Sequence, residues 1–215
     1  MSFGLRCPGP RADGNQAEER AALQNFEYVN DIKTAIGAAS SRIMFAAASS
    51  NSKDEGRAFP ANYSPWVICV HASDGLGNDC GINPLPTETD DNFTTLGMGI
   101  ELLARQWVHT GPTSIPTYKS VYRSGTSFAT PIAAGIAATV LDLAVRVSAI
   151  GGRAREKLRK PEEMRKMLRL MSSPKNSFGS QYRFLAPWNH WERHWQASET
   201  KSQMVWDSIN ALFGA

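Results

Sequence analysis

The sequence is poor in cysteine and in net charge, and it has no apolar leader; each shortage excludes a class of protein. Its three cysteines are odd in number and widely spaced, so they do not form the framework of a disulfide-stapled secreted domain. A formal net charge of +3 over 215 residues is too small to indicate a nucleic-acid-binding surface. The first residues are polar and loop-forming, so no secretory signal is predicted. We therefore expect a cytoplasmic protein that does not bind nucleic acid.

Long apolar stretches are also scarce. The longest runs from Phe128 to Ile150, is rich in alanine and glycine, and contains Asp142 and Arg146. We interpret it as a core helix that ends in water, small and apolar on every side within the core, rather than as a membrane span. The hydrophobic content of 42% and charged content of 20% are ordinary for a globular protein long enough to bury a sizeable core. The prediction is a globular domain with no membrane partner.

The most specific pattern occupies residues 124–135 and reads Ser-Gly-Thr-Ser-Phe-Ala-Thr-Pro-Ile-Ala-Ala-Gly. It is typical of a nucleophile placed at the start of a buried helix. Gly125 lets the backbone turn tightly and approach a ligand. Ser127 then lies where free N–H groups and the positive end of the helix dipole favour a developing oxyanion. We expect Pro131 in the first turn, where no intrahelical hydrogen bond is lost.

With Ser, Pro and Gly at these spacings, the pattern resembles the nucleophile motif of the subtilisin-like serine proteases, the subtilases, whereas Gly-Thr-Ser alone is a common helix cap. Other segments resemble the same family in the same order, and the wording is most similar to intracellular fungal subtilase domains; these segments are residues 1–4, 43–49, 59–61, 66–72, 73–78 and 92–97. The resemblance implies an α/β, subtilisin-like three-layer fold with a parallel sheet. It covers residues 1–191 and leaves residues 192–215 as a helical tail.

The resemblance also implies a serine endopeptidase that hydrolyses peptide bonds with Ser127 as nucleophile, with no cofactor and no metal. Its peptide or protein substrate would contact Gly125 and Thr126 and two strand segments, Ser2-Phe3-Gly4 and Ala46-Ala47-Ala48. In subtilases an asparagine that donates to the oxyanion follows the second strand after one small residue. Here Ser50 holds that position and Asn51 comes one residue later. We assign the oxyanion role to Asn51, because a bulged loop end can re-aim one side chain, with Ser50 as the alternative.

Two motifs that subtilases place before the first of these strands do not occur in the sequence. Serine nucleophiles need a general base and a carboxylate that orients it, and subtilisin carries them in the order Asp, His, Ser. No Asp-Ser-Gly or Asp-Thr-Gly occurs here, and no histidine is followed by glycine. We interpret the chain as the C-terminal part of a subtilase domain whose N-terminal portion is missing, inactive alone, with that segment of the same gene product as a partner. The alternative is a catalytically dead peptide-binding or scaffold module.

None of the four histidines lies in a sequence context typical of the catalytic base. His71 lies within a predicted strand and is interpreted as a core residue. His109, in a predicted loop, is the first candidate if a base is recruited from this chain. His190 and His194 are one helical turn apart, but no cysteine or carboxylate cluster supports a metal site there.

Two charged stretches have ordinary interpretations as solvated surface. Glu88, Asp90 and Asp91 favour a solvated acidic loop over a cation site. Residues 146–169 carry nine basic residues against three acids, and Pro161 opens a helix whose charges we interpret as its solvated face. The apolar stripe of that helix would consist of Met164, Met167, Leu168 and Met171.

Hydrophobic spacing predicts alternating helices and strands. We expect helices at 18–40 and 199–213 besides the two above, and strands at 43–48, 66–72, 93–96 and 99–103. The segment containing Pro112 and Pro116 is expected to be a loop leading to the nucleophile helix. A strand–helix–strand order implies parallel pairing through a right-handed crossover.

Overall fold

The computed structural model describes residues 16–39, 42–48, 56–79, 81–88, 90–110, 113–146, 152–173 and 181–188, with residues 207, 209 and 211; for residues 16–26, 109–110 and 113–114 it describes the backbone only. The described sheet has four parallel strands in the order β1-β2-β3-β6. These strands are Met44–Ala47, Val67–Ser73, Phe93–Leu96 and Arg183–Phe184. Every residue of β2 is buried, as expected for a central parallel strand covered on both faces. The predicted α/β class with a parallel sheet is confirmed.

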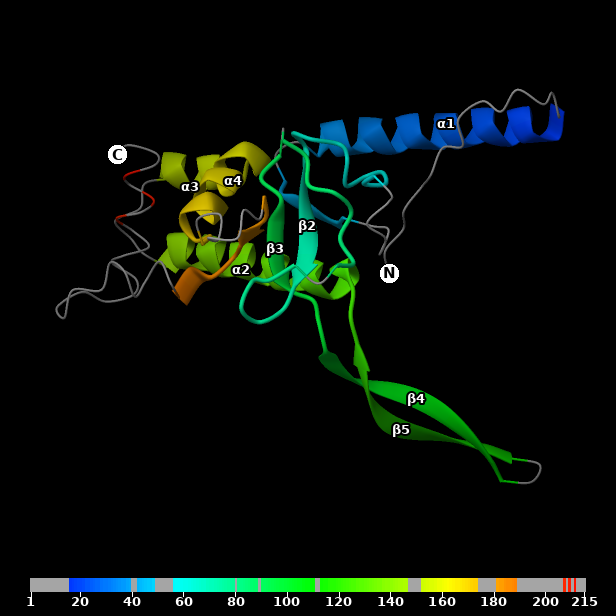
Figure 1. Cartoon of the computed structure of the whole chain (residues 1–215). Coiled ribbons are helices and arrows are strands. Elements are labelled where there is room, and N and C mark those ends of the chain that lie inside the picture. Colours follow the sequence, from blue (N-terminus) through cyan, green and yellow to red (C-terminus); the bar gives the residue numbers. More distant parts are fainter. Residues whose placement is uncertain are drawn as a thin grey trace.

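Helices cover both faces of the sheet, and alternate residues of β2 show which face meets which helix (Figure 1). Ile68, Val70 and Ala72 pack in one buried cluster with α2, which spans Thr126–Arg146. Val67 and Cys69 pack in a second cluster with Val29 and Ile36 of α1, which spans Gln16–Ala38. Burial raises the pKa of the Cys69 thiol to about 12, and Cys69 packs as a small core residue.

The helix α2 packs against the sheet through small residues. Its inner side consists of Ala129, Ala133, Ala137, Val140 and Ala144, spaced three or four residues apart. The expectation that the core surrounds α2 is wrong, because Ile132 and Val145 are exposed on its outer side. By length and composition α2 is apolar enough to cross a membrane, which is weak evidence because helices that pack in soluble cores meet the same criterion.

Two further helices extend the α2 side of the core. The helix α3 spans Gly152–Leu158, and α4 spans Pro161–Leu170 with its proline in the first turn. The predicted apolar stripe of α4 is confirmed, since Met164, Met167 and Leu168 are buried in the same cluster as α2. Ile209, in the expected tail, is helical and fully buried in that cluster.

A long hairpin replaces the expected loop before α2. Strand β4 (Ile100–Thr110) pairs antiparallel with β5 (Thr113–Arg123), and Figure 1 shows the pair projecting away from the sheet and helices. The loop expectation gave too much weight to Pro116. That proline lies opposite Trp107 in a two-stranded ribbon, where an outer edge does not need its N–H. The surrounding β-branched and aromatic residues favour a strand.

Candidate active site

Ser127 is the second residue of α2, and its side chain is exposed while the preceding Thr126 is buried. The turn before it is closed by a hydrogen bond from the Phe128 N–H to the Gly125 carbonyl at 3.1 Å. At this position backbone N–H groups have no intrahelical partner and the helix dipole is positive. The structure therefore places the predicted nucleophile at a helix start, as the motif indicates.

The carboxyl end of β3 holds the nucleophile turn in place. The Gly125 N–H donates to the Gly97 carbonyl at 2.8 Å, and the Gly97 N–H donates to the Ser73 carbonyl at 2.8 Å. Just beyond, the Gly99 N–H donates to Ser124 Oγ at 3.0 Å. The turn is thus fastened to β3 directly and to β2 through Gly97.

Position 97 requires glycine because the space beside it is too small for a side chain, and not because of its backbone angle φ. A Cβ atom at this position would lie 2.6 Å from the Ala72 Cβ and 2.9 Å from the Gly125 carbonyl oxygen. Both distances are shorter than contacts that real Cβ atoms make. Only glycine lets the turn that carries Ser127 lie this close to the sheet.

Side chains at the same edge tie α2 to the strands. Thr95 Oγ1 donates to the Ala129 carbonyl at 2.7 Å, and Ser73 Oγ donates to the Thr95 carbonyl at 2.9 Å. Both side chains are buried. Sequence reasoning missed Ser73, Thr95 and Gly97 as supports of the site, although small polar residues at the ends of buried strands are a signal for such a role.

We expected Pro131 in the first turn of α2, but it lies further inside the helix. It follows Thr126 by five residues, so the carbonyl that would accept its missing N–H is that of Ser127. This leaves the Ser127 carbonyl without its usual intrahelical donor.

Of the predicted cleft walls, one is described. Ala46 and Ala48 are buried and Ala47 is half-buried, and the Ala48 N–H donates to the Val70 carbonyl at 2.8 Å. Because β1 and β3 are parallel in one sheet, β1 ends at the same edge as the Ser127 turn. The other predicted residues lie outside the described part of the chain and stay predictions: Ser2, Phe3, Gly4, Ser50 and Asn51.

His71 is the core histidine that the sequence predicts. It shares the β2 face of Cys69, opposite the face that packs on α2, and it is fully buried. Its Nδ1 lies 3.3 Å from the Phe93 carbonyl oxygen, and its ring centre is 5.0 Å from that of Tyr182. Burial, reinforced by the charge of Arg57, lowers the His71 pKa to about 3. His71 is therefore a very weak base, and it lies on the face of the sheet opposite α2, so it cannot take the proton of Ser127.

His109 lies in β4 and not in a loop, and its backbone pairs with Ser114 next to the hairpin turn. At about 3.3 Å per residue this is roughly 30 Å along the strand from Ile100. Neither histidine in the described ranges therefore stands beside Ser127. His190 and His194 lie outside those ranges, as does the rest of the expected tail apart from residues 207, 209 and 211.

Of the predicted solvated acids Glu88 is exposed, as expected, but the side chains of Asp90 and Asp91 are buried against arginines, so for these two the expectation is wrong. Asp90 accepts hydrogen bonds from Arg57 at 2.6 Å and from Arg165 at 2.7 Å. Burial raises the pKa of Asp90, but Arg165, the Asp91 N–H and Arg57 together lower it below its ordinary value. Arg165 also donates to the Val67 carbonyl at 2.6 Å, so this residue of α4 is not on a solvated face.

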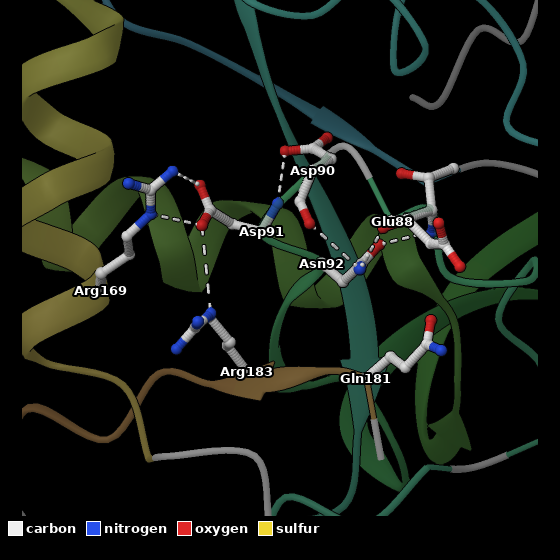
Figure 2. A pocket seen from close by; sticks show the side chains of 8 residues that line it. Glu88, Asp90, Asp91, Asn92, Arg169, Gln181 and Arg183 are labelled. Carbon is white, nitrogen blue, oxygen red and sulfur yellow. Dashed lines mark hydrogen bonds and ion pairs between the residues drawn. The ribbon is translucent and has the colours of Figure 1, made fainter. Parts of the chain in front are cut away.

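A hollow of about 510 Å³ adjoins this network. Figure 2 shows Arg169 of α4 and Arg183 of β6 reaching Asp91, and Arg169 Nε is 2.5 Å from its carboxylate. The hollow lies where β3 begins, at the opposite edge of the sheet from Ser127, and two of its three carboxylates, Asp90 and Asp91, are paired with arginines. In the part of the chain that the structure describes, no three metal-ligating side chains gather. The exposed Ser127 at the other edge stays the candidate nucleophile that the motif predicts.

Comparison with known proteins identifies a family for this chain. The family model described as the subtilase family matches residues 1–181. Among solved structures, the prenylagaramide maturation protease PagA is similar over 94% of this chain and 58% of its own, with 19% identity and a TM-score of 0.49. For the patellamide maturation protease PatG the coverage is 74% and 46%, again with 19% identity and a TM-score of 0.49. The chain thus spans about half the length of these structures. No curated protein matches.

Proposed function

The chain belongs to the subtilase family, and on that premise we propose that it is the nucleophile-bearing part of a serine endopeptidase. The observation that carries the proposal is the position of Ser127, exposed at the start of α2 and fastened to the carboxyl edge of the sheet through Gly125 and Gly97. In the proposed reaction Ser127 Oγ attacks the carbonyl carbon of a peptide bond. A base takes the hydroxyl proton and later gives it to the leaving amine, and water then releases the acyl group.

The base and its orienting carboxylate would come from an Asp- and His-bearing segment of the same gene product, outside this sequence. The fixed turn supports this assignment, because it presents Ser127 to solvent rather than to either described histidine. Without a base, the serine hydroxyl keeps an ordinary alcohol pKa and is a poor nucleophile. We therefore propose that this chain alone does not hydrolyse peptides, and that the complete protein acts in the cytoplasm without a cofactor.

The oxyanion would be stabilised by the N–H groups at the start of α2 and by Asn51, with Ser50 as the alternative. Segment 49–51 follows the last residues of β1, which end at the edge where Ser127 lies. The substrate chain would lie between Ala46-Ala47-Ala48 and Ser2-Phe3-Gly4, next to Gly125 and Thr126. A donor in this position acts on the transition state more than on the bound substrate.

Kinetics of the chain joined to its upstream segment test these roles. Ser127→Ala should abolish hydrolysis of a peptide substrate without unfolding the domain, because only a hydroxyl at an exposed position is removed. Asn51→Ala should lower kcat by about 100-fold or more with little change in KM. The matched control is Ser50→Ala, which should be nearly silent. A damaging Ser50→Ala with a silent Asn51→Ala would reverse the oxyanion assignment.

A peptide-binding or scaffold module that has lost catalysis is the second candidate. The observation that favours it is the placement of His71 and His109, neither of which stands beside Ser127. Such a module would bind peptides at the cleft with the same affinity in the wild type and in Ser127→Ala. It would release no product even when the upstream segment is present.

A further inference from the structure

The hollow beside the arginine–aspartate pairs has the size and the polar lining of a small-molecule site. Its volume of about 510 Å³ is within the range of ligand pockets in proteins. We propose that it binds a short peptide whose amino and carboxyl ends are both free. Glu88 would pair with the ammonium group of this peptide, and Arg183 with its carboxylate. The site is separate from the proposed cleft, because the hollow lies where β3 begins and Ser127 lies at the other edge of the sheet.

Two of the carboxylates at the hollow are already neutralised by arginines. Asp90 pairs with Arg57 and Arg165, whose side chains are only 4% and 7% exposed. Asp91 accepts hydrogen bonds from Arg169 Nε at 2.5 Å and from Arg169 Nη2 at 3.1 Å. These two carboxylates are therefore not available as partners for a ligand.

One charge of each sign is left at the hollow. Glu88 is exposed, and its carboxylate makes no hydrogen bond or ion pair with the residues that the structure describes. Arg183 Nε lies 4.0 Å from Asp91 Oδ1, which is too far for a hydrogen bond, and its guanidinium makes none elsewhere in the described ranges. Because a guanidinium can bind a carboxylate through two parallel N–H groups, Arg183 can receive one from a ligand.

The two unpaired charges lie on different sides of the hollow. Figure 2 shows Arg169 and Arg183 on one side of Asn92, and Glu88 and Gln181 on the other. A ligand that reaches both charges needs its own positive and negative groups apart, as they are at the two ends of a short peptide. The Gln181 amide lines the hollow and makes no hydrogen bond within the described part of the chain. It can therefore donate to, or accept from, a peptide group between the two ends.

Hydrogen bonds to Asn92 hold the backbone of both charged residues in place. The Thr87 N–H donates to Asn92 Oδ1 at 3.0 Å, and Asn92 Nδ2 donates to the Thr87 carbonyl at 2.8 Å. These two bonds close the loop that carries Glu88. The Arg183 N–H donates to the Asn92 carbonyl at 3.0 Å, so the strand β6 is fastened to the same residue. A site arranged in advance in this way lowers the entropy cost of binding.

Ligands with charge of only one sign fit the hollow less well. A simple anion at Arg183 would be repelled by the Glu88 carboxylate, and a cation at Glu88 would be repelled by Arg183. A metal ion would need several carboxylates, but Asp90 and Asp91 are paired with arginines. A peptide with two free ends complements both unpaired charges at once.

Isothermal titration calorimetry of the 215-residue protein with triglycine and its analogues tests the proposal. N-acetyl-triglycine lacks the ammonium group, and triglycine amide lacks the carboxylate. We expect triglycine to bind about tenfold more tightly than either analogue, because each analogue loses one charge-assisted hydrogen bond. Free glycine, whose two charges are attached to one carbon atom, should also bind about tenfold more weakly, because it cannot reach both sides of the hollow.

Two variants assign the ends of the peptide. Glu88→Gln should weaken triglycine about tenfold and should bind triglycine and N-acetyl-triglycine equally. Arg183→Gln should weaken triglycine by a similar factor and should bind triglycine and triglycine amide equally. The matched controls are Glu156→Gln and Arg159→Gln, which remove exposed charges elsewhere and should leave the affinity unchanged. A purely structural effect would weaken all the peptides alike, and circular dichroism of each variant checks its folding.

Absence of triglycine binding, or equal binding of triglycine and both analogues, would overturn the proposal. N-acetyl-triglycine that binds as tightly as triglycine would show a simple carboxylate site instead, and glycine that binds as tightly would exclude the assignment to a peptide. Binding that neither Glu88→Gln nor Arg183→Gln weakens would place the peptide outside the hollow. The measurement needs no catalysis, so Ser127→Ala should bind triglycine like the wild type. If the reconstituted enzyme hydrolyses peptides while the hollow binds none, only the inference about the hollow is wrong.

Discussion

Gly97 and Ser127 show how one residue fixes the position of another. The nucleophile turn can approach the sheet only because position 97 has no side chain, and both N–H···O=C bonds that hold the turn pass through Gly97. Overpacking of a filled site costs about 1–3 kcal/mol, and here the displaced atoms include the Gly125 carbonyl. The geometry of Ser127 therefore depends on a residue thirty positions earlier.

Gly97→Ala should lower the free energy of unfolding by about 2 kcal/mol and shift the nucleophile turn away from β3. Urea denaturation measures the first effect. Gly135→Ala is a matched control, because nothing lies within 4 Å of its added Cβ and an alanine in a helix is preferred over glycine. We expect that control to be neutral or stabilising. Equal stability of Gly97→Ala and the wild type would contradict the role assigned to Gly97.

The buried His71 makes stability depend on pH. Its pKa is about 3 in the folded protein, because of burial and then Arg57, and about 6.5 in an unfolded chain. The unfolded state therefore binds more protons between these values, and the free energy of unfolding should fall as the pH drops below 6.5. The slope from this residue reaches about 1.4 kcal/mol per pH unit.

Urea denaturation of the wild type and of His71→Gln at pH 7.5, 6.0 and 5.0 checks this. Gln retains an N–H for the Phe93 carbonyl but does not titrate, so the variant should lose stability less steeply between pH 6.5 and 5. Parallel slopes for the two proteins would show that His71 does not titrate as described.

At the scale of elements, local sequence patterns predict the structure of a segment whose contacts are nearby in the sequence. They do not predict it where the segment's partners lie far along the chain. The start of α2 follows from Gly125, Ser127 and the apolar residues after them. The ion pair between Asp90 and Arg165 joins residues 75 positions apart, and each residue alone suggests a solvated surface. The hairpin was missed because Pro116 predicts a loop unless its position on an open ribbon is known.

The Asp90–Arg165 pair should contribute to the attachment of α4 to the sheet. Arg165→Leu leaves the buried Asp90 carboxylate with Arg57 as its charged partner and the Asp91 N–H as a further donor, and it removes the donor to the Val67 carbonyl. Breaking such a pair from one side costs about 3 kcal/mol in unfolding free energy. Arg146→Gln, which breaks the exposed pair with Asp142, is the control and should change stability little. Similar losses in the two variants would contradict the buried role of Arg165.

At the scale of the molecule, the sequence predicts the class of fold and the chemistry, while the structure shows how the parts are placed. Parallel order follows from strands alternating with helices, and the apolar run of β2 indicates cover on both faces. The sequence does not show that the two ends of the sheet differ in role. The carboxyl edge carries Ser127, whereas arginine–aspartate pairs lie at the amino edge, with the hollow beside them.

Above all, we propose that Ser127 is a nucleophile positioned by this chain but activated by a base from outside it. Labelling with a fluorophosphonate probe, which reacts only with activated serines, tests this proposal most directly. The purified 215-residue protein should give no more labelling than its Ser127→Ala variant. The same protein joined to an upstream segment carrying the Asp and His motifs should label at Ser127. Stoichiometric labelling of Ser127 in the 215-residue protein would contradict the proposal, and His109→Ala would then be the first variant to test for a recruited base.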